Sequence, residues 1–456
     1  MSRSVKLPKY NSLGLPIRWF GLADGNSFYC SCEISQKPWF EDRAVIVASN
    51  SDKIAIALNR KAKSLGFKMG DLLFEKVKEI REHRVLIYPS NYEMYGKISG
   101  DMHTALASFV TDYEVSSIDE GYMDFTGFDE YVDLHDYGRE IIDTIRYGKW
   151  IPIALGIAPT KTLAKVANKL AKKADSDRKG FYLIATEQER VEALRKTALD
   201  DVWGIGNATY NKLTWELGRW NGVTAYDFAV MNRKRVRKLL GVVGERMWME
   251  LNGIQCYGFE LKPEDKKQIR SSRMLTPTVT EYDQVLAALT HHLVTTVGKL
   301  RRQRSYARKM FIYFMTSQHE DYKGPKAVRS MEVRFSSPLN TVSEMLPYLT
   351  SAAESVWPDY RSWQFKYKFS KCGVELKEIS PDCAKQPCFG EDVERSRKLQ
   401  DLQQAIDEIN GDSPADKRTI LFGPELAGKE KVEFVREGLS DNPTSQWEHR
   451  HKIRNE

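Results

Sequence analysis

The segment Glu114–Phe125 constrains the fold of this chain more than any other. It contains one strand pattern (EVSSI), a tight turn at Asp119-Glu120-Gly121 and a second strand pattern (YMDF), which predicts an antiparallel hairpin. Two carboxylates, Asp119 and Glu120, stand at the hairpin tip. A further extended segment ends at Asp24, where Gly, Asn and Ser indicate a turn. If these strands are neighbours in one sheet, three carboxylates converge on one exposed edge.

Clustered carboxylates without His or Cys ligands select hard divalent cations, Mg²⁺ above all. Two such ions could activate a hydroxyl, bridge a triphosphate and neutralise a leaving pyrophosphate. Cationic side chains that could hold the phosphates are Arg60 and Lys63 on a short predicted helix over 57–65, and Lys172 on a predicted helix over 160–174. An acidic hairpin tip is more often an ordinary solvated turn, so the spacing alone leaves both interpretations open.

Length and composition limit the protein class. A chain of 456 residues with 41% hydrophobic content predicts two to four domains. No apolar stretch approaches the roughly 20 residues that span a bilayer, so we expect no membrane segment. The basic N-terminus lacks the apolar region of a secretory signal, and the six cysteines form no CxxC pair. We therefore expect an intracellular protein with reduced thiols.

The chain changes character along its length. Strands and helices alternate in the α+β manner up to about residue 185, and a helical region with short Gly turns follows to about 258. A polar segment over 259–268 is a predicted linker. Four strand patterns and two helical patterns over 269–378 then predict a β-α-β-β-α-β module. The remainder has one clear helix, Val393–Ile409.

Two features favour binding to a polyanion. Residues 266–378 carry 19 basic against 10 acidic side chains, interleaved with aromatics. The turn Gly204-Ile205-Gly206 lies between helical patterns, where backbone N–H groups at a helix N-terminus can bind a phosphate without reading a base. Taken separately, a solvated sheet face and an ordinary helix–helix turn explain these features as well.

Five ordered segments carry a family resemblance. They are LADGNSFYCSCE, SNYEMYGKISGDM, SSIDEGYMDFTG, GIAPTKTLAKVANKLAKK and LDDVWGIGNATYNKL. In this order they resemble the motifs of Y-family translesion DNA polymerases, and most closely the UmuC type, the catalytic subunit of bacterial DNA polymerase V and its plasmid and phage relatives. The resemblance covers roughly residues 17 to 378.

The resemblance implies a metal site. Asp24, Asp119 and Glu120 match the metal-binding catalytic carboxylates of the family, and the main-chain carbonyl of Gly25 matches a further metal ligand. The implied cofactor is Mg²⁺, as two ions.

The resemblance also implies a nucleotide site. Tyr29 matches the steric gate, an aromatic side chain that crowds a ribose 2′-OH, and Phe28 would pack beneath the sugar. Lys63 and Lys172 match basic ligands of the incoming triphosphate. Arg60 departs from the family pattern, because many relatives have Tyr at this position.

The fold implied is a multidomain right-hand polymerase of the α+β class, with a ferredoxin-like palm sheet and a helix-hairpin-helix at Gly204, Ile205 and Gly206 that binds DNA. The implied domains are the palm (17–29 and 93–185), the fingers (30–92), the thumb (186–258), the linker (259–268), the little finger (269–378) and a C-terminal tail for protein partners (379–456).

The resemblance implies several partners: primer–template DNA, a dNTP, a UmuD′-like accessory subunit and a RecA-type recombinase. A sliding clamp would bind a Gln followed by aliphatic and aromatic anchors. Here that segment is Gln386-Pro387-Cys388-Phe389-Gly390, which is degenerate, with Gln386 and Phe389 as the contacts it retains.

We therefore predict a low-fidelity, template-directed DNA polymerase for lesion bypass and SOS mutagenesis, located in the bacterial cytoplasm at the nucleoid. Two alternatives from other classes stay open. One is a catalytically silent DNA-binding regulator of replication. The other is a phosphodiester hydrolase that uses the same metals and releases nucleotides without needing dNTPs.

Overall fold

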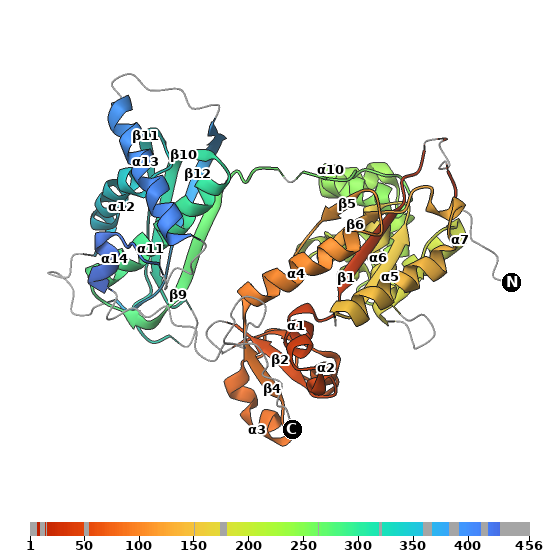
Figure 1. Cartoon of the computed structure of the whole chain (residues 1–456). Coiled ribbons are helices and arrows are strands. Elements are labelled where there is room, and N and C mark those ends of the chain that lie inside the picture. Colours follow the sequence, from red (N-terminus) through yellow and green to blue (C-terminus); the bar gives the residue numbers. More distant parts are fainter. Residues whose placement is uncertain are drawn as a thin grey trace, which may run out of the picture. The chain divides into compact units, whose positions relative to one another are not determined.

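The computed structural model describes residues 7–9, 14, 16–49, 54–149, 151–173, 180–262, 264–318, 322–358, 367–382, 392–411 and 418–428. These residues form two compact units, one up to Lys262 and one from 264 onward (Figure 1). Three sheets are found among them, two in the first unit and one in the second.

The larger sheet of the first unit has the strand order β5-β6-β1-β7-β8. Its central strand β1 pairs antiparallel with β6 on one side and with β7 on the other. The predicted hairpin is confirmed, since β5 and β6 are antiparallel neighbours. The predicted turn was misplaced, because Glu120 and Gly121 are the first residues of β6 and only Asp119 of the two carboxylates lies in the connecting turn. The strand bounds are β1 Phe20–Gly25, β5 Tyr113–Val115, β6 Glu120–Asp124, β7 Ile153–Ala158 and β8 Phe181–Leu183.

Helices cover both faces of this sheet. Successive side chains of β1 point to opposite faces, and those on each face are buried against helices. Ala23 lies in one core with residues of α4 (Tyr92–Ala107) and α5 (Leu134–Lys149). Phe20 and Leu22 lie in a second core with α6 (Lys161–Lys173). The helix predicted over 160–174 thus has nearly the predicted bounds. It places a row of lysines along one face of the sheet.

A smaller lobe of the first unit contains a sheet of order β3-β2-β4 (Figure 1). The helix predicted over 57–65 was wrong at its start, because Ala57 and Leu58 belong to β3 and the side chain of Asn59 caps the helix that begins at Arg60. The bounds are α1 Phe28–Gln36, β2 Val45–Ala48, β3 Ala55–Leu58, α2 Arg60–Ser64, α3 Val77–Glu82 and β4 Leu86–Pro89.

A helical region follows the larger sheet and shares its second core. The carboxylate of Glu250 is fully buried and accepts a hydrogen bond from the Thr162 N–H at 3.0 Å, which joins this region to the start of α6. The bounds are α7 Glu187–Lys196, the 3₁₀ turn η4 Leu199–Asp201, α8 Asn207–Leu217, α9 Ala225–Ala229 and α10 Arg233–Leu251.

The first residues of the predicted linker pack against the larger sheet. The Phe259 ring is stacked on Phe20, with centroids 4.8 Å apart, and the Glu260 N–H donates to a carboxylate oxygen of Glu114 at 2.6 Å. The aromatic residue and this hydrogen bond therefore attach the chain to the first unit before it leaves at Lys262.

The second unit confirms the predicted β-α-β-β-α-β order. Its strands form a sheet of order β11-β10-β12-β9, with a core between the sheet and its two helices. The helix Val342–Val356 begins at the Thr341 side chain, which accepts from the Glu344 N–H. The bounds are β9 Ile269–Val279, α11 Tyr282–Arg302, β10 Ser305–Thr316, β11 Val328–Leu339, α12 Val342–Val356 and β12 Phe369–Pro381.

Part of the predicted C-terminal tail belongs to this second unit. The expected helix is present as α13 (Val393–Asn410), and α14 (Gly423–Gly428) contacts α11 (Figure 1). The Gln403 side chain accepts from the Val342 N–H at 3.0 Å. A buried ion pair between Arg418 and Glu425 lies beside α11. The predicted clamp contacts, Gln386 and Phe389, lie outside the described residues.

Two expectations about chemistry can be compared with the described residues. Across these ranges, no helix has both the length and the apolar character that a membrane span requires. The cysteines of the described part, Cys30, Cys32, Cys256 and Cys372, are free thiols, as the sequence predicts.

Candidate active site

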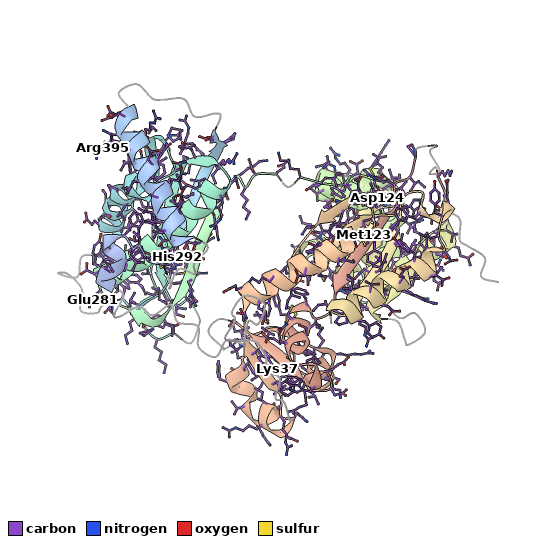
Figure 2. The ribbon with its side chains drawn as sticks, viewed as in Figure 1. Lys37, Met123, Asp124, Glu281, His292 and Arg395 are labelled. Carbon is purple, nitrogen blue, oxygen red and sulfur yellow. The ribbon has the colours of Figure 1, made fainter. Side chains whose placement is uncertain are left out.

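The antiparallel pairing of β1 with β6 brings two predicted carboxylates together. Asp24 is the register partner of Glu120, so both side chains leave the sheet on the same face. Figure 2 labels Met123 and Asp124, which lie farther along β6, the strand that begins at Glu120. Asp24 is buried and Glu120 is half-buried.

The third carboxylate, Asp119, is held at the same edge by its own turn. The Gly25 N–H donates to the Asp119 carbonyl at 2.8 Å, which closes the turn onto the end of β1. The Ser117 hydroxyl donates to the Asp119 carboxylate at 2.6 Å and accepts from the Glu120 N–H at 3.1 Å. The negative charge of Asp119 acts on Asp24 and on Tyr29, so all three predicted carboxylates belong to one site.

Two lysines of α6 neutralise two of these carboxylates. Lys172 lies 2.5 Å from Asp24, and Lys165 lies 2.6 Å from Glu120. Within the described ranges, no three carboxylate, histidine or cysteine side chains are gathered as a metal-binding group. The structure thus shows ammonium groups on the carboxylates that the sequence assigns to a metal.

Burial dominates the electrostatics of Asp24. Loss of solvent raises the pKa of its carboxyl to about 7, against the favourable charge of Lys172, and the neighbouring Glu120 and Asp119 raise it further. A divalent cation beside Asp24 would add to the positive charge of Lys172 and favour the ionised carboxylate. The oxygens of Asp24, Asp119 and Glu120 are the hard donors that Mg²⁺ prefers, so these residues could hold such an ion once Lys172 and Lys165 leave the carboxylates.

Tyr29 stands beside this edge on a layer of aromatic rings. Its ring is stacked on Tyr95 at 4.8 Å and meets Tyr92 edge-on at 5.6 Å. Tyr95 is fully buried, and its hydroxyl donates to Glu33 at 2.6 Å. Stacking on Tyr95 therefore restrains the plane of the Tyr29 ring.

Phe28 is buried directly against the start of the site. A Cβ atom added to Gly25 would lie 2.9 Å from the Phe28 ring, so only glycine lets the chain pass this close. The predicted main-chain ligand Gly25 and the predicted sugar support Phe28 are therefore packed against each other.

The other predicted phosphate ligands lie on α2. Arg60 begins this helix in the smaller lobe, and Lys63 lies one turn later; both are exposed. The charge of Lys63 acts on the buried thiol of Cys30 in α1. The structure gives no contact that joins Arg60 to the site.

The predicted phosphate-binding turn has the expected form. Gly204 adopts φ +89°, where an added Cβ would lie 2.7 Å from Met247. Ile205 is buried, and Gly206 is the N-cap of α8. The first N–H groups of α8 thus face the surface beyond a turn whose shape requires glycine.

Comparison with known proteins decides the family. Residues 23–169 match the model of the impB/mucB/samB family, and residues 266–387 match the C-terminal domain of that family. Protein SamB of Salmonella typhimurium is 30% identical over 432 residues, covering 94% of this chain and 98% of SamB. The chain belongs to the impB/mucB/samB family.

Other relatives agree with this placement. Protein UmuC of Salmonella typhimurium is 31% identical to this impB/mucB/samB family member, with 94% of this chain and 98% of UmuC covered. DNA polymerase IV of Bacillus velezensis is 25% identical over 73% of this chain and 77% of its own length. The resemblance to the UmuC type inferred from the five motifs is confirmed.

Solved structures support the fold. A Y-family DNA polymerase chimera, Dbh-Dpo4(243-245)-Dbh, matches with a TM-score of 0.60 and 18% identity, covering 80% of this chain and 99% of the chimera. The insertion ternary complex of Dbh DNA polymerase matches with a TM-score of 0.50 and 18% identity, covering 80% and 99%. The predicted α+β polymerase fold is confirmed.

The structure of this family member adds three residues that sequence reasoning did not assign to the site. Ser117 orients Asp119, Tyr95 supports Tyr29, and Lys165 pairs with Glu120. The sequence did carry a signal for Lys165, because it lies seven residues before Lys172 and therefore on the same face of α6. Ser117 and Tyr95 gave no signal of their own beyond lying inside the motifs.

Proposed function

We propose that this chain is a template-directed DNA polymerase of low fidelity that carries out translesion synthesis in the SOS response. One observation carries the proposal: Asp24 and Glu120 are register partners where β1 ends and β6 begins, with Asp119 beside them. A rigid aromatic gate, Tyr29, stands next to that edge. This combination suits nucleotidyl transfer better than binding alone.

The proposed reaction is attack of a primer 3′-OH on the α-phosphate of a dNTP, with pyrophosphate leaving. Asp24, Asp119, Glu120 and the carbonyl of Gly25 would hold two Mg²⁺ ions, which lower the pKa of the 3′-OH and neutralise charge on the phosphates. Ser117 keeps the Asp119 carboxylate oriented toward this edge. The hydrogen bonds between β1 and β6 fix the spacing of the other two carboxylates, Asp24 and Glu120.

The proposed nucleotide contacts come from two elements. Lys172 would move from Asp24 to the triphosphate, since both are anionic partners of the same ammonium group. Lys63 and Arg60 would reach the same phosphates from α2. Tyr29 would crowd a 2′-OH, because Tyr95 behind it leaves the ring no room to retreat.

We propose domain roles that follow the sequence-based division. The five-stranded sheet with its helices is the palm (17–29 and 93–185), the smaller lobe is the fingers (30–92), and the helical region is the thumb (186–258). The linker (259–268) leads to a little finger (269–378) that binds template phosphates. The region from 379 would bind protein partners, and its residues 392–411 and 418–428 would do so from the surface of the second unit.

The proposed partners beyond DNA and dNTP are a UmuD′-like accessory subunit and a RecA-type recombinase. Clamp binding through Gln386 and Phe389 is a weaker expectation, because the peptide lacks a second aromatic anchor. The corresponding location is the bacterial cytoplasm at the nucleoid.

Primer extension with Asp119→Asn tests the proposal. The variant should lose extension and keep primer–template affinity within several-fold, because the phosphate grip lies elsewhere. Asp101→Asn, the same change on an exposed residue of α4, is the matched control and should extend normally. Nucleotide release without dNTPs would instead indicate a hydrolase. No extension by the wild type, even with the accessory subunit and activated recombinase, would indicate a silent DNA-binding regulator.

A further inference from the structure

Lys165 has two partners, and they belong to different functional regions. Its ammonium group lies 2.6 Å from the Glu120 carboxylate and 5.7 Å from the centroid of the Trp203 ring. Glu120 is a proposed metal ligand. Trp203 immediately precedes the Gly204–Gly206 turn, which the sequence predicts to bind the DNA backbone.

The surroundings make this lysine responsive to charge. Lys165 and Glu120 keep 17% and 24% of their side-chain area exposed, so the ion pair is partly desolvated yet open to an arriving cation. An ammonium group and a divalent cation compete for the same carboxylate oxygens. The face of a tryptophan ring gives the displaced ammonium a second favourable position.

Trp203 is placed to respond to the primer. The residue is 52% exposed, and its ring meets Tyr257 edge-on at 6.1 Å. The backbone N–H of Tyr257 donates to the buried Glu250, which also accepts from the start of α6. A DNA strand bound at the turn would therefore fix the Trp203 ring, which already contacts Lys165 on α6.

We propose that Lys165 is a positioning residue that couples primer binding at the thumb turn to metal binding at Glu120. Without ligands, the Lys165 ammonium group forms an ion pair with the Glu120 carboxylate. Primer binding orders Trp203, which draws the ammonium toward its ring and frees the carboxylate for the cation. Because coupling is reciprocal, the metal in turn strengthens the grip on the primer. This inference rests on the proposed function.

Metal affinity, rather than activity, tests the coupling. Mn²⁺ binding is measured by electron paramagnetic resonance with and without a primer–template ending in a dideoxynucleotide, after subtraction of Mn²⁺ bound to DNA alone. The gain in affinity on adding DNA should be at least about fivefold larger in the wild type than in Lys165→Met or Trp203→Leu. Without DNA, Lys165→Met should bind Mn²⁺ more tightly than the wild type, because Glu120 has lost its competing cation.

Two further variants separate positioning from structure. Lys169→Met removes another lysine of α6, one that pairs with Asp201 in η4 rather than with a metal carboxylate; it should keep the wild-type gain. Lys165→Arg should restore part of the gain. An equal gain in the wild type, Lys165→Met and Trp203→Leu would overturn the inference, even if the wild type extends primers normally. Absence of extension with an intact difference in gain would count against the proposed function alone.

Discussion

Replacing Lys161 with Met should lower, by a calculable amount, the free energy needed to open the five-stranded sheet and its helix α6. Lys161 begins α6, and its ammonium donates to both carboxylate oxygens of Glu114 at 2.7 and 2.6 Å. The two side chains are only 8% and 9% exposed, and the ammonium also lies 4.8 Å from the Tyr122 ring. Met fills a similar volume, so the main loss is the charge opposite Glu114.

The cost follows from what Glu114 can do next. A buried, uncompensated carboxylate costs about 3–5 kcal/mol. Protonation offers an alternative, which for an ordinary glutamate at pH 7 costs about 4 kcal/mol. The Glu260 N–H still donates to Glu114, so we expect a loss of about 3 kcal/mol in opening free energy at pH 7.

Hydrogen exchange read by mass spectrometry measures the opening of α6 and β5 separately from the second unit. Lys196→Met is the control, because its pair with Glu192 is about half exposed on both sides and should contribute within about 0.5 kcal/mol. A loss below about 1 kcal/mol would refute this reasoning.

Three further predictions concern the gate, the turn and the second unit. Tyr29→Ala should raise ribonucleotide incorporation, read as the ratio of kcat/KM for rNTP and dNTP; an unchanged ratio would contradict the proposed role of Tyr29 as a steric gate. Gly204→Ala, at φ +89°, should strain the turn by about 1–2 kcal/mol and weaken primer–template binding in anisotropy titrations, whereas Gly206→Ala, which has open space, should not; equal affinities would contradict the assignment. Burial lowers the pKa of His291 to about 4 and of His292 to about 3. Since both lie below the unfolded value near 6.5, urea unfolding of the second unit should show stability falling from pH 6.5 toward 4 by up to about 1.4 kcal/mol per histidine and pH unit; a flat profile would exclude neutral burial.

Local patterns predicted the elements that carry the site. The apolar face of Leu163, Val166, Ala167 and Leu170 predicted α6 to within about one residue at each end, and alternation around the acidic turn predicted the hairpin. The second unit was equally predictable, because its strands and helices are long and strongly periodic. The start of α2 was not, since Ala57 and Leu58 fit a strand and a helix equally well.

The contacts that define the chemistry are not local. Lys165 reaches Glu120 across 45 positions in the sequence, and no pattern in one helix specifies which carboxylate it meets. The same holds for α13, whose helical pattern was clear but whose Gln403 bonds to Val342, 61 positions away. Sequence reasoning therefore singled out Asp24, Asp119, Glu120 and Tyr29, while the residues that contact them were evident only in the folded chain.

Primer extension past an abasic site tests the central claim most directly. The assay compares undamaged and abasic templates, with Mg²⁺ and all four dNTPs, for the wild type and Asp119→Asn, with the UmuD′-like subunit and activated recombinase present. We expect the wild type to extend primers past the lesion and Asp119→Asn to extend neither template. Extension that survives in Asp119→Asn would contradict the metal site, and a wild type that copies neither template would contradict the assignment as a bypass polymerase.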